Sequence, residues 1–117
     1  MSIFVLARFD VRAQRQADFE EIALALRGQA EDEPGTRTYR WFSAGDSSYL
    51  VLEEYTDAQA ALAHNERAAE LLERVGQCAE MVYAELYGPI GPELGEWVRS
   101  HPQVTSYADF PDHGAAR

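Results

Sequence analysis

The sequence predicts one α+β domain whose elements run in the order β-α-β-β-α-β, and three observations support this prediction. Short runs of β-branched and aromatic residues alternate with longer segments of helical periodicity. Two strand-like segments are separated only by Gly45-Asp46-Ser47, which predicts a hairpin. The 117 residues suffice to bury a core, and 46% of them are hydrophobic against 26% charged. The order is that of the ferredoxin-like split βαβ arrangement.

The first half of the predicted domain contains a strand, a helix and a hairpin. Residues 3–11, IFVLARFDV, are mostly β-branched and aromatic and predict the first strand. Apolar side chains recur at helical spacing in residues 13–32, which predicts an amphipathic helix that Pro34-Gly35 ends. Residues 36–44 and 48–55 predict the two strands of the hairpin.

The second half adds one helix and one strand. Thr56 and Gln59 have the spacing of a capping box, in which each side chain bonds a backbone N–H near the other residue. A helix is therefore expected over residues 57–75, and Gly76 ends it. Residues 78–87 predict the fourth strand.

The last thirty residues differ in character, because they contain four of the five prolines. We expect a core domain over residues 1–88 and a C-terminal extension over residues 89–117, with a short helix near residues 93–100. Trp97 is expected to pack against the body of the protein or against a partner. The chain beyond Asp112 is expected to be loosely ordered.

Charge and cysteine content exclude several classes of partner. Ten Lys and Arg residues against twenty Asp and Glu residues give a net charge of -10, which argues against nucleic acid and anionic membranes. The single cysteine, Cys78, excludes an intramolecular disulfide and a cysteine-rich metal site. The apolar run from Ile3 ends at Arg8, too early for a signal peptide or a membrane span. A cytoplasmic location is expected.

Both faces of the predicted sheet are apolar. In the first strand one face carries Ile3, Val5, Ala7 and Phe9, and the other carries Phe4 and Leu6. The two helices can cover only one face, so something else must cover the other. We therefore predict a homodimer that packs sheet face on sheet face and closes a barrel-like interior.

No nucleotide, flavin or metal motif occurs in the sequence. It contains no GxGxxG, no P-loop and no nucleophile elbow. His64, His101 and His113 lack the spacing of zinc ligands. We expect neither a metal nor another cofactor, and the candidate residues are polar and aromatic side chains within apolar elements.

His64 is the first of these candidates. On a helical wheel it lies within about 40° of Ala68, Leu71 and Val75, so it flanks the apolar stripe of its helix. An imidazole there could bind or deprotonate a substrate hydroxyl. The alternative is a partly buried structural histidine bonded to a strand carboxylate.

Charged residues at the third and first strands are the next candidates. Glu53 and Glu54 end the third strand on opposite faces, so only one of them can point toward the helices. That carboxylate could orient His64 or pair with an arginine such as Arg8 or Arg40. Arg8 lies in an apolar strand and must be paired or reach solvent.

Aromatic residues on the strands are candidates for ligand contact. Tyr39 and Trp41 share one face of the second strand and could enclose a planar aromatic ligand, or they could belong to the core. Tyr83 on the last strand presents the same alternatives.

Taken together, these segments resemble the antibiotic biosynthesis monooxygenase family over about residues 3–88. The resemblance rests on the first strand, the Glu33-Pro34-Gly35 stop, the hairpin, residues 50–71 (LVLEEYTDAQAALAHNERAAEL) and the closing AELYG strand. Glu54-Tyr55 and Ala63-His64 stand where the strand-end glutamate and the helix histidine of the family fall. The resemblance implies a dimeric α+β barrel with one pocket per protomer, between the sheet and its helices.

The resemblance also implies an activity, that of a cofactor-independent monooxygenase acting on a phenolic or quinol-type aromatic small molecule with O₂. An electron-rich phenol, once deprotonated in a dry pocket, can pass an electron to O₂ itself. The expected catalytic residues are His64 as base or hydrogen-bond partner, Glu54 as its orienter and Arg8 as anion stabiliser. The expected substrate contacts are Tyr39, Trp41, Asn65 and Tyr83.

Two other functions stay open at this point. Several family members have an asparagine in the first strand, where this chain has Arg8, and its only asparagine is Asn65. The chain could therefore be a non-catalytic dimeric binding or stress-response module for a small aromatic metabolite, or an isomerase or cyclase. A closed cavity with His64 and a strand carboxylate in hydrogen-bond reach would favour the enzyme, and a filled core would favour the module.

Overall fold

The computed structural model describes residues 1–111 and confirms the predicted α+β fold. Within this range one open sheet has the order β2-β3-β1-β4-β5. Its strands are β1 (Ile3–Val11), β2 (Thr36–Ser43), β3 (Ser48–Tyr55), β4 (Ala79–Tyr87) and β5 (Val104–Tyr107). The helices are α1 (Gln16–Glu31), α2 (Ala58–Arg67), α3 (Ala69–Cys78) and α4 (Gly91–Arg99), with a 3₁₀ turn at Ala13–Arg15 before α1. His113 and the chain beyond Asp112, expected to be loose, lie outside the described residues.

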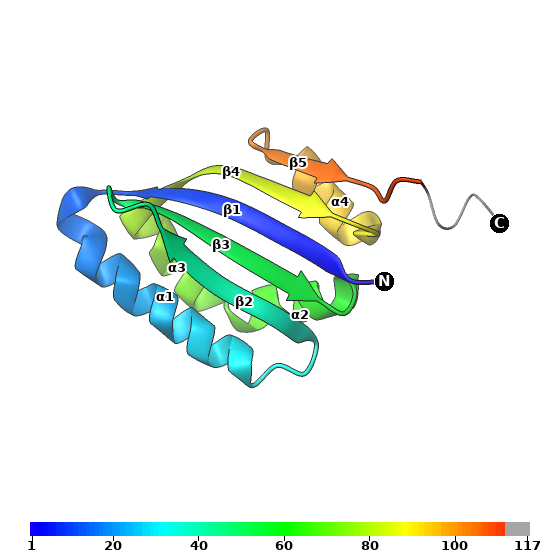
Figure 1. Ribbon diagram of the computed structural model, residues 1–117, viewed down its shortest axis with the longest axis horizontal. Helices are drawn as coiled ribbons and strands as arrows, with labels where there is room; N and C mark the ends of the chain where they lie inside the picture. Colours follow the sequence, from blue (N-terminus) through cyan, green and yellow to red (C-terminus); the bar gives the residue numbers. More distant parts are fainter. Residues whose placement is uncertain (112–117) are drawn as a thin grey trace.

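Strand register gives the sheet two distinct faces. On the inner face, which the helices cover, Val5 of β1 pairs with Glu53 of β3, and Ala7 pairs with Val51 (Figure 1). On the outer face the intervening residues pair, such as Leu6 with Leu52. Inner side chains such as Ile3 are buried, whereas Phe4 beside it on the outer face is 40% exposed. The described helices leave the outer face uncovered, and none of them is long and apolar enough to cross a membrane.

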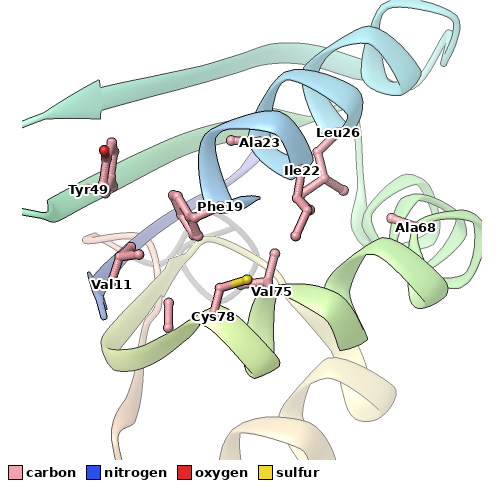
Figure 2. Packing of buried hydrophobic residues seen from close by; sticks show 10 residues of the cluster. Val11, Phe19, Ile22, Ala23, Leu26, Tyr49, Ala68, Val75 and Cys78 are labelled. Carbon is pink, nitrogen blue, oxygen red and sulfur yellow. The ribbon is translucent and has the colours of Figure 1, made fainter. Parts of the chain in front are cut away.

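Two clusters of buried side chains fill the space between the inner face and the helices. The first joins α1 and α3 to the hairpin end of the sheet, through Phe19, Leu26, Tyr49, Val75 and Cys78 among others (Figure 2). The second joins α2 and α4 to the opposite end of β1, β3 and β4. The partly buried Phe9, Tyr39 and Trp41 pack against both clusters and connect them into one core.

The helix expected over residues 57–75 is two helices. It breaks at Ala68, whose φ of -90° and ψ of 1° leave the helical range, although neither Gly nor Pro occurs there. The predicted capping box at Thr56 and Gln59 is also displaced by one residue. The side chain of Asp57 is the N-cap and accepts a hydrogen bond of 2.9 Å from the Ala60 N–H.

The C-terminal extension packs against the body of its own chain. The predicted short helix is α4, and a strand that the sequence does not predict, β5, follows it and pairs in parallel with β4. Gly88 and Gly91, with φ of 108° and 76°, form the turns that lead from β4 into α4. A Cβ on Gly88 would lie 2.9 Å from the Ser2 carbonyl oxygen, so the chain passes close to its N-terminus here.

Candidate functional site

A cavity of about 400 Å³ lies between the inner face of the sheet and helices α2, α3 and α4. Its deeper wall contains three small residues, Ala7 of β1, Ala84 of β4 and Ala61 of α2. Ala7 and Ala84 are cross-strand partners, and all three are almost completely buried. The space exists because alanines stand at core positions where larger side chains would fill it. We refer to it as the inner cavity.

The inner cavity is mostly apolar but contains one carboxylate and one amide. Glu53 reaches it from β3, and Asn65 reaches it from α2. Ligand sites in proteins commonly combine apolar walls with a few convergent polar groups of this kind. Among residues 1–111 no cluster of three His, Cys, Asp or Glu side chains is arranged to hold a metal ion.

Glu53 is the strand-end carboxylate that points toward the helices. The hydroxyl of Tyr55, on the same face, donates a hydrogen bond to Oε1 of Glu53. Burial raises the pKa of Glu53, and the nearby Glu33 charge acts in the same direction, while the Tyr55 hydrogen bond and His64 oppose the shift. Glu53 therefore holds a proton more readily than an exposed glutamate does.

His64 is buried behind the wall of the inner cavity, with 2% of its surface exposed. Its Nδ1 lies 2.7 Å from Oε1 of Glu33, in the loop after α1. Its ring centroid lies 5.1 Å from that of Tyr39 and 5.5 Å from that of Tyr55. His64 thus contacts a loop carboxylate and two aromatic rings. It lines a separate pocket of about 260 Å³ with Glu33 and Arg67, whereas its neighbour Tyr55 lines the inner cavity.

The Glu33 carboxylate has two further donors. The Thr36 hydroxyl donates to Oε1 at 2.8 Å, and Nη1 of Arg67 donates to Oε2 at 3.3 Å. Three donors offset the cost of burying this carboxylate, whose side chain is 10% exposed.

Three of the predicted site residues lie on the outer face. Glu54 accepts a hydrogen bond of 3.1 Å from the Thr38 hydroxyl and does not contact His64. Arg8 pairs with Asp10 at 3.3 Å and donates to the Ser48 hydroxyl at 3.1 Å. Arg8 and Tyr83 both line a separate cavity of about 410 Å³ near the hairpin. The sheet therefore separates these residues from His64 and Asn65.

Tyr39 and Trp41 lie on the inner face, within the core between the two clusters. Their rings contact each other at a centroid distance of 6.2 Å, and Trp41 packs edge-on against Phe19 at 5.5 Å. Burial raises the pKa of the Tyr39 hydroxyl, and the charges of Glu53 and Glu33 add to the shift. These two aromatic residues pack in the core and do not line the inner cavity.

Of the two glutamates that end the third strand, the sequence analysis assigned the catalytic role to Glu54 and considered Glu53 as its alternative, and it did not select Glu33 or Trp97 as site residues. The alternation of β3 places Glu53 with Tyr49 and Val51, but both faces are apolar, so alternation alone does not identify the inner face. Glu33 is separated from His64 by 31 positions, beyond any local pattern. Trp97, expected from the sequence to pack against the body of the protein or against a partner, lines the inner cavity.

Comparison with known proteins identifies a family and a shared fold. A family model described as antibiotic biosynthesis monooxygenase matches residues 2–71. MupZ from Pseudomonas fluorescens has 21% identity and a TM-score of 0.76, over 92% of this chain and 89% of that chain. SnoaB, described as a cofactor-independent oxygenase from Streptomyces nogalater, has 17% identity and a TM-score of 0.64, over 73% and 89%. Rv0793 from Mycobacterium tuberculosis has 19% identity and a TM-score of 0.67, over 79% and 98%. No curated protein matches the sequence at a significant level.

We predict that His64→Ala lowers the free energy of unfolding by about 2–4 kcal/mol, because it leaves the nearly buried Glu33 carboxylate without its shortest hydrogen-bonding contact. Urea unfolding measures the change. Arg67→Ala is the matched control, since it removes a more exposed donor from the same carboxylate, and it should cost less than about 1 kcal/mol. Equal losses in the two variants would show that the His64 contact is not the main restraint.

A second prediction concerns the pH dependence of stability. Because the folded-state pKa of Glu53 is raised, its contribution is complete below the ordinary glutamate pKa of 4.5 and is lost as the pH rises through the raised value. Glu53→Gln should therefore be more stable than the wild type near pH 8 and similar to it near pH 4. Urea unfolding at both pH values tests this, with Glu54→Gln as the control that removes the same charge from the outer face. An advantage of Glu53→Gln that did not grow with pH would contradict it.

Proposed function

Because the chain belongs to the antibiotic biosynthesis monooxygenase family, we propose that it is a cofactor-independent monooxygenase that oxidises a phenolic or quinol-type aromatic small molecule with O₂. The inner cavity carries the proposal. It is large enough for a small ring system, its walls are apolar, and Glu53 and Asn65 supply a carboxylate and an amide. The description of SnoaB, which shares the fold, agrees with this class of reaction.

In the proposed reaction Glu53 is the general base. It is the carboxylate of the cavity wall, and its raised pKa suits it to accept a proton from a phenolic or enolic hydroxyl. The amide of Asn65 can donate a hydrogen bond to the oxygen that becomes negatively charged. Apolar walls keep water away from the anion, which makes it a stronger electron donor.

The anion itself is the reductant. It transfers one electron to O₂, and the resulting radical pair joins through a new carbon–oxygen bond, giving a peroxide anion that takes up the proton held by Glu53. Loss of the remaining hydrogen on that carbon, with cleavage of the O–O bond, leaves a carbonyl group and releases water. In sum, a ring CH₂ group and O₂ become C=O and H₂O, so all electrons come from the substrate.

We assign His64 as a positioning residue, where the sequence led us to expect a base or a hydrogen-bond partner of the substrate. It contacts the ring of Tyr55, and the Tyr55 hydroxyl donates to Glu53, so His64 fixes the base through one intermediate side chain. Arg8, Glu54 and Tyr83 lie on the other side of the sheet, and we assign them to an interface between subunits.

That interface is the proposed homodimer contact. The outer face presents large apolar side chains from several strands, and they are Phe4, Leu6, Phe42, Leu50 and Leu52. Arg8, Arg40 and Glu54 stand between these side chains on the same face. Exposed apolar side chains rimmed by polar ones are typical of an association surface. A second copy placed on it would close the barrel-like interior that the sequence predicts. The cytoplasmic location expected from the sequence stays a prediction.

The activity is tested by O₂ uptake with anthrones and hydroquinones. We expect the wild type to consume O₂ with a phenol of this class and Glu53→Gln to lower kcat by about 10²- to 10³-fold, because the substrate proton has no acceptor. Glu66→Gln, an exposed glutamate next to Asn65, is the matched control and should keep the wild-type rate.

A second variant tests the cavity separately from the base. Ala84→Leu places three extra carbon atoms into the inner cavity and should abolish substrate binding while the melting temperature is retained. If the wild type binds anthrones but consumes no O₂, the monooxygenase proposal fails and a binding module is the better description. Full activity of Ala84→Leu would locate the reaction elsewhere.

The dimer is tested by light scattering at micromolar concentration, where we expect the mass of two chains. Leu52→Lys, which places a charge at the centre of the outer face, should give a monomer. Leu24→Lys is the control, since Leu24 is already 58% exposed on α1. A monomeric wild type would overturn the proposed interface.

A further inference from the structure

Helix α4 completes the inner cavity through Leu94 and Trp97. Leu94 is 3% exposed and anchors the helix in the second core cluster. Trp97, one turn later, lines the same cavity but is 37% exposed. Leu72 of α3 and Asn65 of α2 also line the cavity and are exposed. The entrance therefore lies between α2–α3 and α4, and Trp97 borders it.

The position of Trp97 is fixed by the turn that ends α4. The ring of His101 lies against the indole, with a centroid distance of 4.7 Å and an angle of 35°. Nδ1 of His101 lies 2.8 Å from the Trp97 carbonyl oxygen and 3.0 Å from the Ser100 hydroxyl. One face of the indole is thus supported by its own chain, so the ring is held at the entrance instead of moving freely.

The need to anchor α4 does not explain why a tryptophan stands at position 97. Leu94 already supplies the buried contact of α4, and a side chain that only sealed the core would not keep more than a third of its surface exposed. The wall opposite includes the small side chains of Ala7 and Ala84, which leave room for a flat ring. The lining contains Glu53 and neither Lys nor Arg, so it disfavours an anionic ligand.

The chemistry and the entrance come from different parts of the chain. Glu53 and Asn65 fall within residues 2–71, which the family model matches, whereas α4 lies beyond that stretch. The match to SnoaB covers 73% of this chain, and the match to MupZ covers 92%. The residues of α4 therefore add to the inner cavity a wall that lies outside the stretch matched by the family model.

We propose that Trp97 is a specificity-determining residue, which selects neutral planar aromatic ligands over saturated ligands of the same size by packing its indole against their ring. The inference rests on the inner cavity of the proposed function. Contacts between aromatic rings stabilise a complex beyond the area that they bury, by an amount that corresponds to about a two- to tenfold change in affinity. A saturated ring of the same size gains only the binding free energy that comes from burying its apolar surface.

Calorimetric titration of 1-naphthol and of decahydro-1-naphthol tests the proposal, because the two compounds share a skeleton and a hydroxyl but differ in planarity. The wild type should prefer 1-naphthol. Trp97→Leu should weaken 1-naphthol about three- to tenfold and change decahydro-1-naphthol less than twofold. Trp97→Phe, which keeps a ring, should retain most of the preference. Glu93→Ala, on the exposed side of α4, is the matched control and should bind as the wild type does.

A second readout follows ligand binding in the wild-type protein, and it needs Trp97→Phe only to assign the signals. The chain has two tryptophans, so an amide correlation spectrum contains two indole N–H signals, which Trp97→Phe assigns. Addition of 1-naphthol should shift the Trp97 signal more than that of Trp41, which lies in the core.

The outcomes separate this inference from the proposed function. Selective loss of 1-naphthol binding in Trp97→Leu supports the inference, even if no phenol leads to O₂ uptake and the monooxygenase proposal fails. An equal change for both compounds, no change for either, or no binding of either compound to the wild type overturns it.

Discussion

The Glu33 carboxylate is the contact on which the geometry of the inner cavity depends. It accepts hydrogen bonds from Thr36 at the start of β2 and from Arg67 at the end of α2, and it contacts His64 within α2. The loop after α1 is thereby fastened to α2, the helix that carries Asn65 into the cavity. His64 in turn holds the ring of Tyr55, whose hydroxyl bonds to Glu53. Glu33 therefore helps to position Glu53, through His64 and Tyr55.

The sheet separates two kinds of surface that the sequence makes equally apolar. The inner face is interrupted by alanines, and the volume they leave empty is a loss of packing that a stable core would normally avoid. The outer face keeps its large side chains, with Arg8 and Glu54 each bonded to a neighbouring polar residue. In our proposal, this division provides a reaction cavity on one side of the sheet and a subunit contact on the other.

Element order could be predicted from the sequence because it depends on local signals, namely periodicity, turn residues and Pro34-Gly35. The break at Ala68 has no such signal, and β5 is a short polar strand whose pairing with β4 depends on α4 returning the chain to the sheet edge. Glu53 and Glu54 show the limit most clearly. Alternation assigns them to opposite faces, but only the packing of the helices decides which face is inner. Glu54, at the family-like position, lies on the outer face, and the carboxylate that contacts His64 is Glu33 from a distant loop.

The glycine turns around α4 have a consequence for how such a protein can diversify. Gly88 and Gly91 bring the chain out of β4, and β5 returns it to the same strand, so α4 is a crossover connection whose two ends are held by the sheet. Substitutions on its cavity side change one wall of the inner cavity, whereas Glu53 and Asn65 lie on β3 and α2. Under the proposed function, ligand preference can therefore change through mutations in a nine-residue helix that does not carry the proposed base.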